Sequence, residues 1–496
     1  MLEQHIIDSF VSIVGKDNVD TSNMGRLTYS YDATPNFQAM PDAVVAPRNM
    51  GRLTYSYDAT PNFQAMPDAV VAPRNTNEVA EILKVCNDHK VPVYVRGSGT
   101  NLCAGTCPLE GGVVLIFRHM NHILEIDEEN LTITVQAGVI TLDIIKAVEE
   151  KGLFYPPDPS SMKISTIGGN INENSGGLRG LKYGVTRDYV MGLEIVLPNG
   201  DIIRTGGKLA KDVAGYDLTR LFIGSEGTLG VVTEAILKLV PMPETKKTML
   251  ALYQDINEAA RAVSAIIANK IIPATLEFLD QPTIEVVEEF AQIGLPTDVK
   301  AILLIEQDGS PEVVNRDIEK MAEVCRSMHA VDVRIAKDET EADALRTARR
   351  SALSALARLK PTTILEDATV PRSQIAPMVE AINAIAKKYD ISICTFGHAG
   401  DGNLHPTCMT DARNAEEMHR AEQAFAEIFE KAIELGGTIT GEHGVGAMKA
   451  PYLELKLGKE GIAAMKGIKQ AFDPHNIMNP GKMFAKDSRK RVVVER

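Results

Sequence analysis

Two histidines and a glutamate in the C-terminal third carry the strongest signal for metal chemistry in this sequence. The segment FGHAGDGNLHP places His398 and His405 seven residues apart across a glycine-rich turn, and GTITGEHGVGAMK adds Glu442. Two imidazoles and one carboxylate leave positions open on a divalent ion such as Fe²⁺, Zn²⁺ or Mn²⁺. A ligand with adjacent hydroxyl and carboxylate oxygens could fill these positions. The alternative is that the histidines only stabilise a tight turn.

His443 follows Glu442 directly and is the candidate base. If residues 440–444 are extended, the two neighbouring side chains point to opposite sides, so that one binds metal and the other does chemistry. We assign Glu442 to the metal and His443 to proton transfer, because an imidazole can accept a proton near neutral pH from a hydroxyl that a metal has acidified. A non-haem iron oxygenase uses the same kind of ligand set, so the metal alone does not define the reaction.

A substrate carboxylate would need a cation. The segment ALRTARRSALSALARLK has the pattern of a helix and offers Arg346, Arg349 and Arg350. A guanidinium can bind a carboxylate through two parallel hydrogen bonds. The alternative is a solvated basic helix face.

Three glycine-rich segments could hold a phosphorylated cofactor. The loop RGSGTN at 96–101 follows a predicted strand, so its backbone N–H groups can converge on an anion. An ordinary turn is the better explanation of this loop when it is taken alone. The segment STIGGNINENSGG at 165–177 and the segment GSEGTLG at 224–230 add two more loops of this kind. Together the loops could surround an extended dinucleotide.

These motifs occur in a recognisable order. PDAVVAPRN, RGSGTNL, PPDPSS, STIGGNINENSGG, LKYG, GSEGTLGVVTEA and NPGK follow one another along the chain. In this order the sequence resembles the vanillyl-alcohol-oxidase-type (PCMH) flavoproteins. Within them it is similar to the group of the glycolate oxidase flavin subunit, D-lactate dehydrogenase and D-2-hydroxyglutarate dehydrogenase. The resemblance covers nearly the whole chain.

The resemblance implies FAD as cofactor and a set of residues that bind it. These are Arg96, Gly97, Ser98, Gly99, Thr100, Asn101, Leu102, Pro157, Asp158, Thr166, Gly168, Gly169, Asn170, Gly176, Glu226, Gly227, Val231 and Asn479. Members of the family with covalent flavin carry a His or Cys in their cofactor loops. Neither 96–102 nor 165–188 contains His, so we expect non-covalent FAD, with Cys103 as the nearest thiol.

The resemblance also bears on the substrate. It favours Arg349 among the three arginines and agrees with His443 as the base. The D-2-hydroxyglutarate enzymes carry a lysine where this chain has Leu365. This departure argues against a second substrate carboxylate, and therefore favours D-lactate, followed by glycolate.

Periodicity predicts an α+β fold in two main domains. A two-subdomain PCMH-type FAD-binding domain is expected at 50–243, because Pro241 and Pro243 mark a break after which long helices alternate with strands. An α+β cap or substrate domain with the metal site follows at 244–450. A helix is expected at 1–23, and a C-terminal helix with a tail that returns to the FAD site at 451–496.

Residues 24–49 recur letter for letter as residues 50–75. Diverged structural repeats do not stay identical, and a solenoid needs at least three units. A recent duplication or an artefact explains the identity better. Only one copy can occupy the native strand position, and the second copy leads directly into the helix pattern TNEVAEILKVCNDHK.

Composition and charge restrict the class of protein. The net charge of -14 would repel phosphate backbones, which argues against nucleic-acid binding. There is no apolar run long enough for a transmembrane segment and no secretion signal, so we expect a cytoplasmic protein. Six scattered cysteines fit reduced thiols.

The sequence thus predicts an FAD-dependent dehydrogenase of a small D-2-hydroxy acid, with hydride passing to the flavin. The expected acceptor is an electron-transferring flavoprotein, a quinone or an iron-sulfur subunit. The chain has no Cys-rich cluster motif, so any iron-sulfur centre must belong to a partner. The alternatives are an oxidase that uses oxygen and a non-catalytic FAD-binding subunit.

Overall fold

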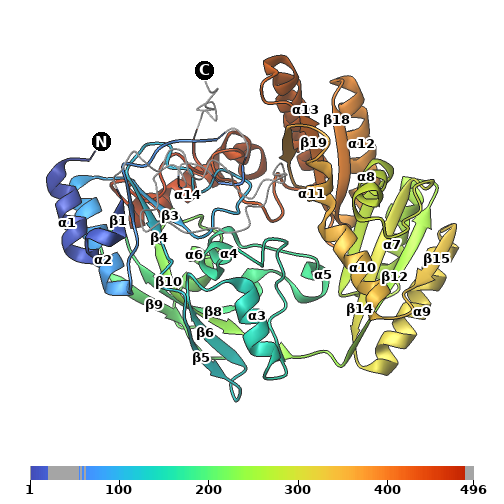
Figure 1. Ribbon diagram of the computed structural model, residues 1–496, viewed down its shortest axis with the longest axis horizontal. Helices are drawn as coiled ribbons and strands as arrows, with labels where there is room; N and C mark the ends of the chain where they lie inside the picture. The colour runs from blue at the N-terminus through green and yellow to red at the C-terminus, as the bar shows by residue number, and fades with distance from the viewer. Residues whose placement is uncertain (1, 21–54, 56–57, 61–62, 486–496) are drawn as a thin grey trace.

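The computed structural model describes residues 2–20, 55, 58–60 and 63–485. Two bodies lie side by side, and the chain passes from the first to the second and then returns to the first (Figure 1). Each body combines helices with sheets of its own. The predicted α+β class is therefore confirmed.

A small sheet opens the first body. Its strands, in spatial order, are β1 (Val19–Asp20), β2 (Ala69–Val71), β4 (Val113–Ile116) and β3 (Val93–Arg96). The last three are parallel and largely buried on both faces, which explains why they are apolar except for Arg96 at the end of β3. Helices α1 (Gln4–Val14) and α2 (Thr76–His89) pack on this sheet.

The second copy of the repeat supplies part of this sheet. Its residues form β2, and its last residue, Asn75, caps α2 by accepting a hydrogen bond from the amide of Glu78. The first copy, 24–49, lies outside the described residues.

A five-stranded antiparallel sheet completes the first body. Its order is β5 (Ile123–Asp127), β6 (Thr132–Gln136), β10 (Val231–Lys238), β8 (Val190–Val196) and β9 (Ile202–Gly206). The β8–β9 hairpin turns at Asn199–Gly200, where Gly200 has a φ of 85°. The remaining elements of this body are α3 (Thr141–Glu149), α4 (Ile167–Glu173), α5 (Gly180–Tyr183), α6 (Leu218–Phe222), β7 (Leu153–Phe154) and β11 (Val240–Pro241).

The second body, which we call the cap, is built on one eight-stranded sheet. Its order is β15 (Asp332–Ile335), β12 (Thr245–Tyr253), β14 (Ala301–Gly309), β13 (Thr275–Asp280), β18 (Ser392–His398), β19 (Asn403–Thr410) and β16 (Thr362–Leu365), with β17 (Ala368–Thr369) also paired to β19. All of these pairs are antiparallel.

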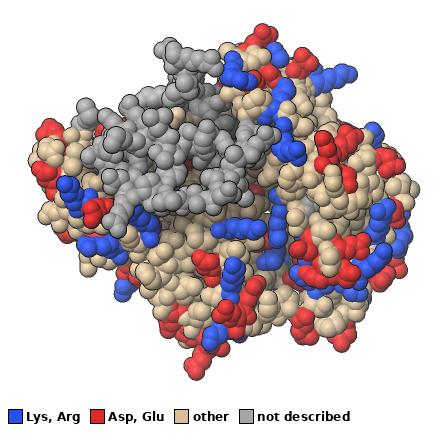
Figure 2. Space-filling view, in the orientation of Figure 1, with Lys and Arg blue, Asp and Glu red and all other residues tan. Residues whose placement is uncertain are grey.

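Helices cover both faces of the cap sheet. One face carries α7 (Ile256–Ala268), α9 (Pro311–Ser327), α12 (Ile375–Lys388) and α13 (Ala415–Glu434), and the other carries α8 (Gln281–Ala291), α10 (Glu339–Arg350) and α11 (Ala352–Leu356). Strand β12 shows the consequence of the two-residue period, because Met249 and Ala251 enter one core and Leu250 and Leu252 the other. Acidic and basic side chains are interspersed over the visible face of the cap (Figure 2).

The chain returns to the first body through α14 (Leu453–Phe472) (Figure 1). Beyond α14, Met478 forms a parallel bridge with Val93, and the amide of Asn479 donates to the carbonyl of Val93 at 2.7 Å. Short 3₁₀ turns occupy Lys16–Asn18, Thr186–Asp188, Arg372–Gln374 and Ala450–Tyr452. Among the described helices, none combines the length and the apolar character needed to span a membrane.

Candidate active site

A cavity of about 390 Å³ is lined by residues of both bodies. Helix α5 ties the bodies together beside it, because the Tyr183 hydroxyl donates to the Asp308 carboxylate of β14 at 2.8 Å and Lys182 pairs with the same carboxylate. Most of the predicted cofactor residues lie on the cavity wall. These are Gly97, Ser98, Gly99, Thr100, Asn101, Leu102, Thr166, Gly168, Gly169, Asn170, Gly176, Glu226 and Gly227.

The first two glycine segments pack directly on each other where they line the cavity. A Cβ atom at Gly97 would collide with the Thr166 side chain, and one at Gly168 would collide with Ala137. Gly99 has a φ of 72°, which favours glycine. Side chains at these positions would fill the space between the loops, so the wall fits a cofactor that is approached closely by backbone.

Five predicted cofactor residues do not line the cavity. The Arg96 side chain donates to the Thr106 hydroxyl at 3.1 Å and lies over the Tyr55 ring, behind the loop. Asp158 is buried, with its carboxylate 3.7 Å from Arg179, and Pro157 is buried as well. The remaining two are Val231 and Asn479.

The positions of Val231 and Asn479 have simple causes. Successive residues of β10 face opposite sides, so Val232 reaches the cavity while Val231 enters the core beside α2. The Asn479 side-chain amide donates to the carbonyls of Gly105 at 2.9 Å and Glu226 at 2.6 Å. Asn479 therefore braces two cavity loops from behind.

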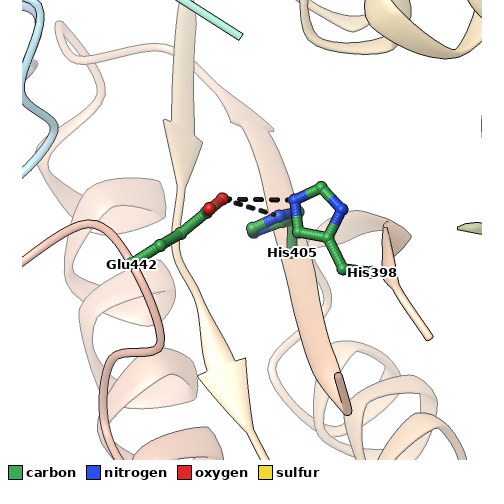
Figure 3. Close-up of side chains that lie close together, drawn as sticks. All are labelled: His398, His405 and Glu442. Atoms are coloured by element: carbon green, nitrogen blue, oxygen red, sulfur yellow. Dashed lines mark hydrogen bonds and ion pairs between the residues drawn. The ribbon is translucent and has the colours of Figure 1, made fainter. Parts of the chain in front are cut away.

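The three predicted metal ligands come together at one end of the cavity. His398 ends β18, His405 lies on the adjacent β19, and the Glu442 carboxylate points toward both imidazoles (Figure 3). One Glu442 oxygen lies 3.3 Å from His398 Nε2 and 3.4 Å from His405 Nε2. Ligands about 2.1 Å from one ion would be roughly 3.0 to 3.4 Å apart in octahedral or tetrahedral geometry. The donor set therefore fits a divalent metal.

The turn that carries Glu442 is not extended, contrary to the premise used for its assignment. The buried Asp367 carboxylate accepts hydrogen bonds from the successive amides of Gly441, Glu442 and His443 at 2.8, 2.7 and 3.1 Å. Three amides converging on one oxygen bend the backbone. As a result both Glu442 and His443 face the cavity.

Asp367 is itself paired with the buried Lys449 ammonium at 2.6 Å. Burial alone would raise the pKa of Asp367, but Lys449 and the amides of the turn hold the pKa below its ordinary value. The turn is thus built on an ionised carboxylate.

His443 lies beside the three candidate metal ligands and is not one of them. Its ring stacks on His405, with centroids 5.2 Å apart and an interplanar angle of 8°. Its Nδ1 atom has no hydrogen-bond partner among the described residues, and its Nε2 atom is 3.8 Å from Glu442. Burial lowers the pKa of His443 to about 4, so the ring is neutral near pH 7 and can accept a proton.

The three candidate arginines differ in whether they line the cavity. Arg346 turns away and pairs with Glu306 of β14 at 2.9 Å. Arg349 and Arg350 both line the cavity. The Arg349 guanidinium is 5% exposed and lies 4.8 Å from the centroid of the Phe396 ring.

Two further residues at the site were not found from the sequence. Glu277 of β13 is fully buried between Arg349 and His398. Its only signal in the sequence is a carboxylate within the apolar strand ATLEFLD, which requires a buried partner. Glu173, at the end of α4, lines the cavity, and burial together with Glu226 raises its pKa well above the ordinary value.

Cys103, the nearest thiol to the first loop, is buried and is not among the residues that line the cavity. Its sulfur lies 3.7 Å from a Glu173 oxygen. Leu365, in contrast, does lie on the cavity wall, as does Phe396.

Comparison with known proteins defines the class. Residues 67–206 match the FAD binding domain family, and residues 242–483 match the C-terminal domain of FAD linked oxidases. The fold is also that of a solved p-cresol methylhydroxylase with substrate bound, with a TM-score of 0.77, 19% identity and coverage of 97% of this chain and 96% of that one.

Two relatives are much closer in sequence. The chain is 78% identical over 496 residues to the glycolate oxidase subunit GlcD of Bacillus subtilis, covering all of both proteins. It is 37% identical over 424 residues to the D-lactate dehydrogenase of Anaerostipes hadrus, covering 83% of this chain and 88% of that one. The chain belongs to the FAD-linked oxidase family. It is an FAD-dependent oxidoreductase, as the motifs predicted.

Proposed function

We propose that the chain oxidises a small 2-hydroxy acid to the corresponding 2-oxo acid, with glycolate and D-lactate as substrates. The observation that carries the proposal is that one cavity joins the glycine loops to His398, His405, Glu442, His443 and Arg349. The names of the two relatives agree with this substrate class.

The residues of the cavity can be given separate roles. Arg349 would bind the substrate carboxylate, and His443 would accept the hydroxyl proton at Nε2, because its buried Nδ1 faces the Asp367 carboxylate at 4.0 Å. Leu365 and Phe396 would shield this end of the cavity from water. FAD bound along the glycine loops supplies a two-electron acceptor for the hydrogen on the substrate's second carbon.

His398, His405 and Glu442 would hold a divalent metal, Fe²⁺, Zn²⁺ or Mn²⁺, which supplies a Lewis acid next to the substrate hydroxyl. A bare histidine pair that only stabilises the turn would not need Glu442 at 3.3 and 3.4 Å from both rings. Metal content of the purified protein identifies the ion.

The test is anaerobic titration of the FAD-loaded protein, followed at about 450 nm, where oxidised flavin absorbs. We expect bleaching by glycolate and D-lactate, much less by L-lactate and D-2-hydroxyglutarate, and loss of bleaching after chelation that added metal reverses. A metal-replete, FAD-loaded protein that none of the four acids bleaches would contradict the proposal and favour a non-catalytic FAD-binding subunit.

We further propose that the electrons leave to a partner protein, either an electron-transferring flavoprotein or an iron-sulfur subunit. The name of the Bacillus subtilis relative as a subunit supports a partner. Aerobic turnover without any partner should then give little peroxide. Stoichiometric peroxide would instead identify an oxidase.

A further inference from the structure

Glu277 is a single buried carboxylate that joins the two ends of the candidate active site. It is 0% exposed and lies in the middle of the cap sheet, on β13. Its Oε1 atom is 2.7 Å from His398 Nδ1, and its Oε2 atom is 2.5 Å from a nitrogen of Arg349. Burying a charge is costly unless it is paired, and this charge has two partners.

The contact with His398 determines which ring nitrogen is free. A carboxylate can only accept at Nδ1, so the proton of the neutral ring stays there and the Nε2 lone pair faces Glu442. Metal-binding histidines are commonly oriented by a carboxylate in this way.

The contact with Arg349 holds the guanidinium at the cavity wall, over the Phe396 ring.

The same contact offsets the positive charge of Arg349. If Glu277 and Glu442 count as two negative charges, and Arg349 with a divalent ion as three positive ones, a single positive charge remains for the substrate. Arg350 is left out of this count because its side chain is 35% exposed and its charge is screened by solvent, while Asp158, 3.8 Å from it, is shared with Arg179. A substrate with one carboxylate would neutralise the site, whereas a substrate with two carboxylates would make its net charge negative.

We propose that Glu277 is a positioning residue that fixes both the ligand nitrogen of His398 and the guanidinium of Arg349, and that its charge restricts the site to 2-hydroxy acids with one carboxylate. The inference rests on the proposed function and deepens it. It predicts two separable effects, one on metal retention and one on selectivity.

The test compares Glu277→Gln and Glu277→Asp. A Gln that accepts from Arg349 turns its NH₂ group toward His398, which moves the ring proton to Nε2 and blocks the ligand atom. We expect Glu277→Gln to bind metal about 10- to 100-fold more weakly. The shorter Glu277→Asp keeps the charge but cannot reach both partners, so it should weaken metal binding and leave selectivity unchanged.

Selectivity is measured with glycolate and tartronate, which differ by one carboxylate. In metal-replete Glu277→Gln, the ratio of the tartronate Kd to the glycolate Kd, taken from flavin absorbance changes, should fall by about tenfold or more, because removing a buried negative charge favours the dianion. The matched control is Glu306→Gln. It removes the β14 carboxylate that pairs with Arg346, a residue on the same helix as Arg349. The metal affinity of Glu306→Gln and its ratio of tartronate Kd to glycolate Kd should match those of the wild type.

An unchanged ratio in Glu277→Gln overturns the role in selectivity, and unchanged metal affinity in both variants overturns the role in positioning. FAD content and the unfolding midpoint show which variants are folded, and Glu277→Asp alone tests the positioning role if Glu277→Gln does not fold. A wild-type protein that no hydroxy acid bleaches would contradict the proposed function, yet metal affinity would still report on Glu277.

Discussion

His443 differs from the two neighbouring histidines in its freedom to exchange a proton. His398 contacts Glu277 and Glu442, and His405 contacts Glu442 at 3.4 Å. The neutral His443 ring lies farther away, with Nε2 3.8 Å from Glu442 and the buried Nδ1 4.0 Å from Asp367. Its stacking on His405 keeps it beside the candidate metal ligands. A base is useful only when it is unprotonated, and burial achieves this here.

His443→Asn should therefore slow flavin reduction by glycolate or D-lactate about 10²- to 10⁴-fold, while FAD and metal stay bound. Anaerobic stopped-flow absorbance measures the rate. The control is His419→Asn, at an exposed position on α13, which should leave the rate unchanged. A wild-type rate in the His443 variant would remove this residue from the mechanism.

At the scale of single residues, the sequence indicated the three candidate metal ligands, which the structure brings together, but it did not indicate the residues that support them. His398, His405 and Glu442 stand in short glycine-rich motifs whose residue types are unusual together, so they could be identified without a fold. Glu277 is a single acidic residue within an apolar strand and Asp367 follows another carboxylate, Glu366, so neither stands in a recognisable motif. Their partners lie far along the chain, 121 residues in the case of His398. Only the pairing of β13 with β18 brings that pair together.

The turn from Gly441 to Gly446 is the element on which the site depends most. Asp367 of the cap accepts from three of its amides, and Glu226 of the first body accepts from the amides of Val445 and Gly446, both at 2.7 Å. The turn is thus fixed from both bodies. This explains how Glu442 and His443 can lie in a loop and still be held in place.

Asp367→Asn should lower the free energy of unfolding by about 3 kcal/mol, because it leaves the buried Lys449 without its nearest carboxylate. It should also reduce metal retention, since the turn loses its ionic anchor. Urea unfolding followed by circular dichroism measures the first effect. Asp411→Asn, which removes a surface pair with Arg413, should lower the free energy of unfolding far less, because solvent screens an exposed pair. Equal losses in the two variants would contradict the role given to Asp367.

Element by element, the sequence was informative wherever periodicity was strong. The helix pattern TNEVAEILKVCNDHK forms α2, and the Asn199–Gly200 turn joins β8 to β9. It was harder to predict which residues of a strand face the cavity. Val231 lies in the core while its neighbour Val232 lines the cavity, because neighbouring side chains of a strand point to opposite faces. The shape of the 441–446 turn could not be predicted, because it is imposed by carboxylates from distant segments.

At the scale of the whole molecule, the identical repeat has a testable consequence. Since the second copy supplies β2 and the cap of α2, the first copy is not needed for either. Deleting residues 24–49 should leave FAD content unchanged and shift the midpoint of thermal unfolding by no more than about 2 °C. Absorbance at 450 nm and differential scanning fluorimetry measure these quantities, and loss of FAD in the deletion variant would give the first copy a structural role.

The bracing of the cavity loops by Asn479 has a consequence for biosynthesis. Asn479 donates to Gly105 and Glu226, and Met478 pairs with Val93, although every strand of both bodies precedes these residues in the sequence. Domains fold as they leave the ribosome, beginning at the N-terminus. The first body can therefore form its sheets early, but its cavity wall is finished only when the segment after α14 has been translated. A nascent chain arrested at residue 472 should release FAD that the completed chain retains, so cofactor capture becomes a late, post-translational step.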